Sequence, residues 1–340
     1  MVRNMKLNER VKENKGEHLL LEKPKLPTKN MLVEINNTCN HKCIFCSVRK
    51  LKRKPLYIKE DFLIRILKEA YVEGIREVGY YISGEPFLNP NLAKYIKIAK
   101  EIGYDYVYIT TNGSLATMDK VQECVEAGLD SIKISINASN QTDYEFIHGK
   151  DDFHIVIDHI KQMATYKKEN HLSFNLFTST ILTKYTANAK EELKELIGED
   201  VDEMMYWKVG NQGGMLSDVI EELSVDQESC KKERCNEAFR TISITCEGYL
   251  SACCVGFSNY LIVADLNKVS LREAWEGEVF TDLRKRLLNN ELDNTVCNNC
   301  MNNTCDSFEP LLEEYCTKQD LSTIYQDGEL DKRKIKFDIG

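Results

Sequence analysis

The sequence predicts an α/β fold that is built on parallel strands and followed by a small cysteine-rich domain. Short apolar runs alternate with amphipathic stretches over residues 31–209, about six times in all. Nine of the thirteen cysteines then lie between Cys230 and Cys316. Strand–helix alternation is typical of parallel sheets with right-handed crossovers. The strand–helix units are fewer than the eight of a closed barrel.

The strands and helices are expected in a regular order after a polar lead-in. Apolar runs predict strands at residues 31–35, 77–82, 104–110, 131–136, 171–181 and 203–209. Apolar side chains at helical spacing predict helices at residues 59–73, 92–102, 119–127, 153–169 and 187–197. In the first of these helices, Phe62, Ile66 and Ala70 recur every four residues. Polar motifs follow the strands, at the end where barrels of parallel strands carry their chemistry.

A change of composition predicts where one domain ends and the next begins. The segment from Asn211 to Gly214 contains two glycines and an acidic stretch follows it, which indicates a boundary. We therefore expect a lead-in over residues 1–30, a barrel domain over 31–215, a cysteine-rich domain over 228–316 and a charged tail over 317–340. The elements of the cysteine-rich domain are too short to bury a large core, so bound metal is expected to stabilise it.

The charge and the hydropathy of the chain disfavour two classes of partner. The formal net charge is −9, from 45 basic and 54 acidic residues, whereas nucleic-acid binders usually show a basic footprint. No apolar run approaches the roughly 20 residues that span a membrane. Residues 1–16 also lack the apolar core of a secretory signal. We expect a cytoplasmic protein that binds neither nucleic acid nor membrane.

Two short basic runs interrupt this acidic composition. The first comprises Arg49, Lys50, Lys52, Arg53 and Lys54, and the second comprises Lys332, Arg333, Lys334 and Lys336. Such runs are usually solvated faces, which is the prediction for both. The alternative for the first run is contact with an anionic substrate or with an acidic electron donor.

The spacing of three cysteines predicts the first metal site. An odd number of cysteines fits a disulfide framework poorly, and in a reducing compartment metal binding is the more common use. Cys39, Cys43 and Cys46 follow the first predicted strand with the spacing C-x3-C-x2-C. Three thiolates can bind three irons of a cubane cluster and leave the fourth iron open to a substrate. A zinc site is the alternative, but zinc ribbons normally pair two C-x2-C units and this region has one.

This cysteine loop resembles the signature of the radical S-adenosylmethionine (SAM) enzymes. The resemblance implies a TIM-like partial (β/α)6 barrel, a [4Fe–4S] cluster on Cys39, Cys43 and Cys46, and SAM bound at the open iron. It also implies a one-electron donor such as flavodoxin or ferredoxin. An electron from the cluster would cleave SAM to methionine and a 5′-deoxyadenosyl radical, which abstracts hydrogen from an unactivated C–H bond.

The same resemblance implies a set of SAM contacts. The segment from Ser83 to Pro86 is similar to the family's Gly-Gly-Glu-Pro segment, with Ser83 in place of the first glycine, and Glu85 would balance the SAM ammonium. Ser135 and Asn137 are two residues apart and would face one side of a strand. Asn112 is either a ligand contact or only the turn residue of an Asn-Gly pair. The predicted SAM-binding residues are Phe45, Ser83, Gly84, Glu85, Pro86, Asn112, Ser135 and Asn137.

The later cysteines resemble the C-terminal SPASM or twitch extensions that carry auxiliary [4Fe–4S] clusters. The spacing suits the twitch type with a single cluster, whose predicted ligands are Cys235, Cys253, Cys297 and Cys300. The chain departs from the full SPASM spacing after Cys300, although Cys230, Cys305 and Cys316 could still complete a second cluster. A structural zinc site is the alternative. Cys124, Cys246 and Cys254 are expected to be core residues or to lie beside a ligand.

The resemblance extends to a reaction type. A cluster with four thiolates has no open iron, so its expected role is electron transfer. Similarity to the single-cluster 2-deoxy-scyllo-inosamine dehydrogenase implies a small polar substrate (a sugar, cyclitol or aminocyclitol) whose alcohol carbon is oxidised or epimerised. Maturation of a ribosomally made peptide is one alternative, and a non-catalytic scaffold is another. Candidates for a base or positioning group, chosen by position only, are His148, Arg240, Tyr206, Trp207 and Lys208.

Overall fold

The structure is a computed structural model of the chain, and it describes residues 21–26, 29–50, 52–225, 235–255, 257–304, 306–317 and 329–339. Cys230 and Cys305 therefore lie outside the described residues. Within the described part, no helix is both long and apolar enough to cross a membrane.

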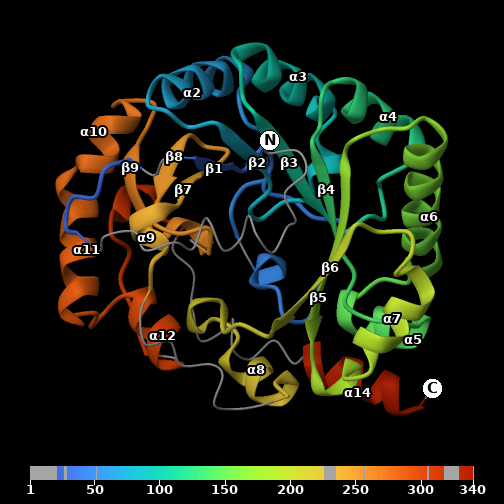
Figure 1. The fold of residues 1–340 in the computed structure, drawn as a ribbon. Helices are drawn as coiled ribbons and strands as arrows, with labels where there is room; N and C mark the ends of the chain where they lie inside the picture. Colours follow the sequence, from blue (N-terminus) through green and yellow to red (C-terminus); the bar gives the residue numbers. More distant parts are fainter. Residues whose placement is uncertain are drawn as a thin grey trace.

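One curved sheet of nine strands forms the frame of the molecule (Figure 1). Six strands run parallel in neighbouring order: β1 (Asn30–Val33), β2 (Glu77–Tyr80), β3 (Tyr106–Thr111), β4 (Ser131–Ser135), β5 (Asn175–Leu182) and β6 (Glu203–Lys208). On the other side of β1 the sheet continues through β7 (Ile242–Ile244), β8 (Tyr249–Ser251) and β9 (Ile262–Asp265). β7 pairs with β1 in parallel. β8 pairs antiparallel with both β7 and β9. The cysteine-rich part of the chain thus extends the sheet of the barrel.

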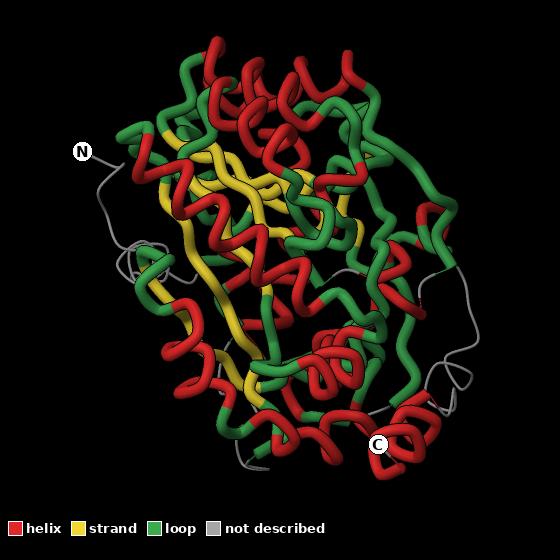
Figure 2. Tube along the Cα trace, turned by 90° about the vertical axis from the view of Figure 1, so that its right-hand side faces the viewer, coloured by secondary structure: helices red, strands yellow, loops and turns green. Residues whose placement is uncertain are grey.

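Most of the helices lie outside this curved sheet (Figures 1 and 2). The helices between the strands of the barrel are α2 (Glu60–Val72), α3 (Leu92–Ile102), α4 (Met118–Glu126), α5 (Gln141–His148), α6 (Phe153–Glu169) and α7 (Ala189–Ile197). Those that follow are α8 (Ser217–Leu223), α9 (Glu237–Arg240), α10 (Leu271–Glu276), α11 (Glu278–Asn289), α12 (Val296–Asn302) and α14 (Glu329–Ile339). Short 3₁₀ turns are η2 (Ser47–Lys50), η3 (Pro86–Leu88), η4 (Lys184–Thr186), η5 (Gln212–Gly214), η7 (Phe257–Asn259) and η8 (Glu313–Tyr315).

The alternation of side chains along each strand separates the core from the barrel interior. Val78 of β2 and Val107 of β3 belong to the core shared with the helices. Their neighbours Gly79 and Tyr108 occupy the opposite face of the sheet, where a Cβ on Gly79 would lie 2.6 Å from the Tyr108 ring. The Tyr108 ring also lies 5.9 Å from that of Tyr81. The outer face is therefore apolar, and the inner face of these strands is rich in tyrosine.

The structure confirms the predicted α/β class, and every predicted strand and helix is present. Most ends lie within two residues of their expected positions. One prediction was wrong: the strand expected from His171 begins only at Asn175. The chain reverses after α6, and His171 adopts a left-handed backbone (φ 51°) that ends any extended run there. The helix α5 and the short strands β7 to β9 were not predicted.

The prediction of two solvated basic faces was also wrong at two positions. Arg53 of the first run is buried, whereas Lys52 and Lys54 are exposed as expected. Arg333 of the second run lies in α14 and donates through Nη2 to the Lys42 carbonyl at 2.6 Å. Both arginines have partners in the fold, so the runs are solvated only in part.

Candidate functional site

The cysteine loop lies directly after β1 and is fixed by contacts with α5. Cys39 is exposed, and Cys43 and Cys46 are half-buried, with no disulfide at any of them. The Ile44 backbone N–H donates to the Ile147 carbonyl at 2.8 Å, and the Lys42 N–H donates to the His148 carbonyl at 3.1 Å. These two hydrogen bonds hold the backbone on both sides of Cys43 against the C-terminal end of α5.

Apolar side chains of the same loop pack into the protein interior. Ile44 and Phe45 are buried in a small cluster with Phe146 and Ile147 of α5, beside residues of α8. The residues between Cys43 and Cys46 thus point into the protein. Phe45, which was predicted as a SAM-binding residue, lies in this apolar cluster.

The three thiols lie close enough to influence one another. Although Cys39 is exposed as a residue, desolvation by the protein around its sulfur raises the pKa of the thiol to about 11, with further contributions from Glu85 and Cys46. Burial also raises the pKa of Cys43, and the neighbouring Cys46 and Cys39 add to the shift. Both thiols are therefore protonated at neutral pH in the absence of metal. Metal binding would need to displace their protons, as is usual for thiolate ligands. The donor set fits an iron–sulfur cluster.

The Ser83–Pro86 segment packs against the start of the cysteine loop. A Cβ on Gly84 would lie 2.1 Å from the backbone oxygen of Asn36, so only glycine fits there. The Glu85 backbone N–H donates to the Thr38 carbonyl at 2.8 Å. The Asn36 Nδ2 donates to the Glu85 carbonyl at 3.2 Å. The ends of β1 and β2 are thus joined just ahead of Cys39.

The Glu85 carboxylate is occupied by donors of the chain itself. It accepts from the Phe87 backbone N–H at 3.1 Å, from the Thr111 hydroxyl at 2.6 Å and from the Asn112 backbone N–H at 2.8 Å. The side chain is only 2% exposed, and burial raises its pKa against these hydrogen bonds. Its contacts tie the end of β2 to the end of β3, where the resemblance predicted an ammonium of SAM.

The side chain of Asn112 reaches the cysteine loop. Its Nδ2 donates to Asn40 Oδ1 at 2.8 Å and lies 3.8 Å from the Cys39 sulfur. Its Oδ1 accepts from the Ser114 backbone N–H at 3.0 Å. Asn112 therefore does more than form the turn with Gly113: it connects the end of β3 to the loop that carries the cysteines.

The other two predicted SAM contacts lie at the end of β4. Ser135 is the last residue of that strand and is half-buried. Asn137 lies beyond the strand, where its Oδ1 accepts from the Ile181 backbone N–H at 2.7 Å and its Nδ2 lies 3.3 Å from His148 Nε2. The ends of β1, β2, β3 and β4 thus bring the predicted residues to one edge of the barrel.

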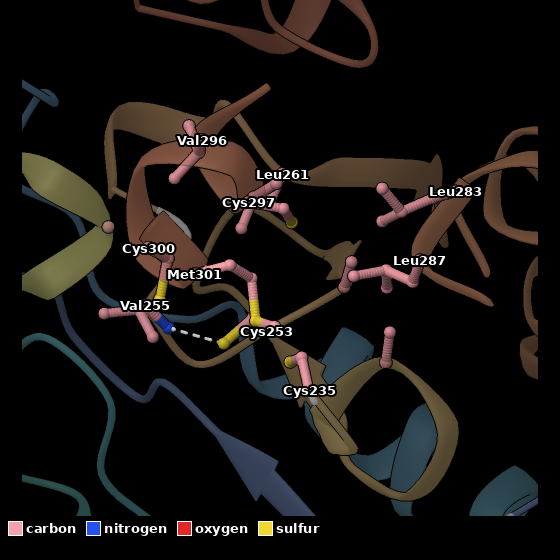
Figure 3. A pocket seen from close by; sticks show the side chains of 13 residues that line it. Cys235, Cys253, Val255, Leu261, Leu283, Leu287, Val296, Cys297, Cys300 and Met301 are labelled. Carbon is pink, nitrogen blue, oxygen red and sulfur yellow. Dashed lines mark hydrogen bonds between the residues drawn. The ribbon is translucent and has the colours of Figure 1, made fainter. Parts of the chain in front are cut away.

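Four of the later cysteines line a single pocket (Figure 3). Cys235 precedes α9, Cys253 follows β8, and Cys297 and Cys300 lie in α12. The rest of the wall is almost entirely apolar and includes Ala252, Val255, Leu261, Leu283, Leu287, Val296 and Met301. Burial raises the pKa of Cys235 to about 11, with a further contribution from Cys253. Burial also raises the pKa of Cys297, to which Cys235, Cys253 and Cys300 contribute. The thiols converge on an apolar site, and four thiols fit a cluster with no open iron.

The remaining described cysteines lie elsewhere. Cys124 is buried in the core on α4, as expected. Cys246 is buried 3.6 Å from Arg53 Nη2. The Cys253 thiol donates a hydrogen bond to Cys254, which raises the pKa of Cys253, so Cys254 lies beside a pocket thiol. Cys316 is half-buried after η8 and does not line the pocket.

The candidates for a base or positioning group do not converge. The Tyr206 hydroxyl donates to the Lys190 carbonyl at 3.2 Å on the outer side of β6, and Lys208 shares that side of the strand. Trp207, between them, takes the opposite side of the strand and is 36% exposed. Arg240 pairs with Glu237 within α9.

Of the positional candidates, His148 alone meets the cysteine loop. It is fully buried, and its Nδ1 lies 3.6 Å from the Cys43 sulfur. Its ring stacks on Tyr144 with centroids 3.9 Å apart. Two further polar residues near this ring, His41 and Asp152, were missed. Nothing local in the sequence distinguishes them, because Asp152 stands 111 positions from its partner His41.

A partial barrel with a cysteine loop after its first strand and a second cysteine site beside the sheet defines a class of iron–sulfur enzyme. Comparison with known families assigns the chain within this class. The sequence profile of the Radical SAM superfamily matches residues 33–204, half of the chain, so the chain belongs to the radical SAM superfamily. The SPASM profile, described as an iron–sulfur cluster-binding domain, matches residues 235–301. The predicted family and its cofactors, [4Fe–4S] clusters and SAM, are confirmed.

Curated relatives match only part of the chain. A probable GTP 3′,8-cyclase of Saccharolobus solfataricus is 31% identical over 135 residues, which is 40% of this chain and 43% of that protein. A probable GTP 3′,8-cyclase of Saccharolobus islandicus is 30% identical over 135 residues, again 40% of this chain and 43% of that protein. The chain thus aligns with less than half the length of these relatives.

Solved structures share the fold over most of the chain. BtrN in complex with AdoMet and 2-DOIA has a TM-score of 0.53 at 18% identity and covers 85% of this chain and 98% of its own. SuiB of Streptococcus suis bound to S-adenosylmethionine has a TM-score of 0.62 at 15% identity, with coverage of 92% and 81%. Native anSMEcpe with bound AdoMet has a TM-score of 0.59 at 14% identity, with coverage of 92% and 99%. At these identities the likeness is one of fold.

Proposed function

We propose that this radical SAM enzyme is an oxidoreductase that oxidises or epimerises an alcohol carbon of a small polar substrate such as a sugar, cyclitol or aminocyclitol. The observation that carries the proposal is the presence of two unlike cysteine sites on one sheet. One offers three thiols on a loop after β1, and the other offers four thiols in an apolar pocket beside β8. A flavodoxin or ferredoxin would supply the electron.

Cys39, Cys43 and Cys46 would hold the first cluster, and the strand ends around them would hold SAM. When bound, the cluster and SAM supply a 5′-deoxyadenosyl radical. Glu85 already accepts three hydrogen bonds, so we assign it the task of fixing the turn. The backbone of Ser83 and Gly84 would then receive the ammonium, in a turn that packs against Asn36. The remaining contacts would come from Asn112, Ser135 and Asn137.

The second site would hold a cluster with no open coordination position. Four thiols occupy its pocket, so no iron of a [4Fe–4S] cluster remains for a substrate. The wall around these thiols is almost entirely apolar. Oxidation of an alcohol radical to a ketone releases one electron and one proton. A closed cluster suits the acceptance of that electron.

The inner face of the barrel supports a polar substrate. The Tyr108 hydroxyl donates to Asn30 Oδ1 at 2.9 Å. Lys133 Nζ lies 5.7 Å from the centroid of the Tyr81 ring. Hydroxyl, amide and ammonium groups on one face match the hydroxyl and amino groups of a sugar or aminocyclitol.

Maturation of a ribosomally made peptide is the second candidate. SuiB, which shares the fold, was solved bound to the precursor peptide SuiA, with a TM-score of 0.62. The same pair of cysteine sites would serve a peptide oxidation, so the substrate decides between the two functions.

Cleavage of SAM by the reduced protein tests the proposal. Anaerobically reconstituted protein should bind iron at both sites and release 5′-deoxyadenosine after reduction with dithionite. A variant with alanine at Cys39, Cys43 and Cys46 should keep only the iron of the second site and lose SAM cleavage. A panel of aminocyclitols, sugars and short peptides then identifies the substrate class through the SAM consumed. The proposal is wrong if the wild type cleaves no more SAM than the triple variant.

A further inference from the structure

The imidazole of His148 lies against the sulfur of Cys43. It comes from the end of α5, more than a hundred positions along the chain. Nδ1 lies 3.6 Å from the Cys43 sulfur and 3.3 Å from His41 Nδ1. On its other side, Nε2 lies 3.3 Å from the Asn137 backbone nitrogen. The ring is fully buried, so water satisfies none of these atoms and the protein groups around it determine its tautomer.

The partner of Nε2 fixes where the imidazole carries its proton. A backbone N–H can only donate, so the Asn137 N–H requires a lone pair on His148 Nε2. An imidazole with a lone pair on Nε2 is neutral and carries its hydrogen on Nδ1. His148 therefore presents an N–H towards its two neighbours, the Cys43 sulfur and His41 Nδ1.

A second histidine holds the complementary tautomer. His41 Nε2 lies 3.1 Å from Asp152 Oδ2, and a carboxylate accepts, so His41 carries its hydrogen on Nε2. Its Nδ1 is then a lone pair facing His148. Lys150 Nζ, 2.9 Å from the same Asp152 oxygen, keeps the carboxylate ionised and in place. The rings of His41 and His148 meet edge to face at 5.4 Å. The hydrogen-bond partners of the two rings thus determine which nitrogen of His148 and which nitrogen of His41 carries a hydrogen.

We propose that His148 is a positioning residue whose Nδ1–H donates a hydrogen bond to the Cys43 thiolate and raises the reduction potential of the first cluster. The inference rests on the proposed function, because it takes Cys43 as an iron ligand. Hydrogen bonds to the sulfurs of an iron–sulfur cluster help to set its potential, and groups beside the ligands orient them. A donor stabilises the reduced state, which carries more negative charge on sulfur. Asn137 fixes the tautomer of this donor, and the His41 Nδ1 lone pair, which Asp152 fixes, shares the Nδ1 hydrogen with the Cys43 sulfur.

The test removes the donor and keeps the ring. His148→Phe retains an aromatic side chain to stack on Tyr144 but has no N–H. His148→Asn keeps an amide N–H at about the position of Nδ1. His154→Phe is the matched control, because His154 is exposed on α6. The midpoint potential is measured on the reconstituted full chain by titration followed with electron paramagnetic resonance, and the signal that changes when SAM is added identifies the first cluster.

We expect His148→Phe to lower the equilibrium constant for reduction at least tenfold, which is about 59 mV for a one-electron couple. His148→Asn should recover most of this shift, and His154→Phe should match the wild type. The inference is overturned if His148→Phe binds full iron, cleaves SAM and keeps the wild-type potential. That outcome leaves the proposed function intact, whereas absence of iron at the triple-cysteine loop in the wild type would remove both.

A measurement on the wild type keeps the inference testable if His148→Phe does not fold. Protein with ¹⁵N-labelled histidine is reconstituted and reduced, and pulsed electron paramagnetic resonance measures nitrogen coupling to the first cluster. A hydrogen bond from Nδ1 to the Cys43 sulfur should give a weak ¹⁵N coupling. A spectrum without histidine ¹⁵N coupling would show that no such bond forms.

Discussion

Arg53 and Glu34 form a bidentate, buried ion pair. Nη1 donates to Oε1 at 3.0 Å and Nη2 donates to Oε2 at 2.6 Å, with the two side chains 3% and 0% exposed. Arg53 also donates through Nε to Glu247 Oε1 at 3.0 Å. Glu34 directly follows β1 and Glu247 lies between β7 and β8. One guanidinium therefore connects the barrel to the hairpin that leads to Cys253.

Replacing this arginine should destabilise the whole chain. Arg53→Met leaves the buried Glu34 carboxylate and the half-buried Glu247 carboxylate without a counter-charge, and breaking a buried pair in this way typically costs about 3–5 kcal/mol. Urea unfolding under anaerobic conditions measures the loss. Lys94→Met is the control, because Lys94 pairs with Glu60 at the surface with 55% of its side chain exposed and should cost less than about 1 kcal/mol. An equal loss of unfolding free energy in the two variants would show that the buried ion pair stabilises the fold no more than a surface pair does.

Gly84 should tolerate no side chain. In Gly84→Ala the new methyl would meet the Asn36 backbone oxygen, so the turn must move away from the cysteine loop. We expect SAM affinity to fall at least tenfold, while the iron content stays near that of the wild type because the cysteines are unchanged. Equilibrium dialysis with labelled SAM measures the first, and iron analysis the second.

The matched control for this change is Gly210→Ala. No atom lies within 4 Å of a Cβ built at Gly210, so this variant should bind SAM as the wild type does. If Gly84→Ala also binds SAM normally, the turn does not form the SAM site.

The regular part of the fold was predictable because its signals are local. Along β2 and β3, alternate side chains enter the core, so Val78 and Val107 mark their strands without knowledge of any partner. The cysteine spacing is equally local. The strands β7 and β8 were missed because three residues are too few to show a period. The helix α5 did carry a signal: Asn140 caps its start, and Gly149, in a left-handed conformation, ends it.

The long-range polar contacts could not be predicted from the sequence. Arg53 and Glu247 stand 194 positions apart, and Cys43 and His148 stand 105 apart. Neither pair has a spacing that any local rule detects. Arg53 lies in a run of exposed lysines, so its burial becomes visible only when β1 and β7 are paired.

The iron content should report the number of auxiliary clusters. The double variant Cys297→Ala, Cys300→Ala removes two of the four thiols that line the apolar pocket, so the iron content should fall from about eight per chain towards four. Cys124→Ala, in the core of α4, should keep about eight. A wild-type value near twelve would instead require a second auxiliary cluster, for which Cys230, Cys305 and Cys316 are the available thiols.

The contact between α14 and the barrel should weaken in acid. The Glu222 carboxylate accepts from Lys184 Nζ and Lys334 Nζ, each at 2.8 Å, and from the Tyr185 hydroxyl at 2.6 Å. The hydrogen bonds from Lys184, Lys334 and Tyr185 lower the pKa of Glu222 from 4.5 to about 2. A lowered folded-state pKa contributes stability above pH 4.5 that is lost as the pH falls towards 2.

Amide hydrogen exchange across residues 329–339 tests this expectation, once the intrinsic pH dependence of exchange is removed. Wild-type protection should fall as the pH is lowered from 6 to about 3. Glu222→Gln should be less protected at pH 6, and its difference from the wild type should shrink in acid because the stability that the ionised carboxylate contributes is lost progressively below pH 4.5. Glu221→Gln, at the exposed neighbouring position, should follow the wild type throughout. A difference between Glu222→Gln and the wild type that stays constant across this range would mean that the ionised carboxylate does not hold α14 in place.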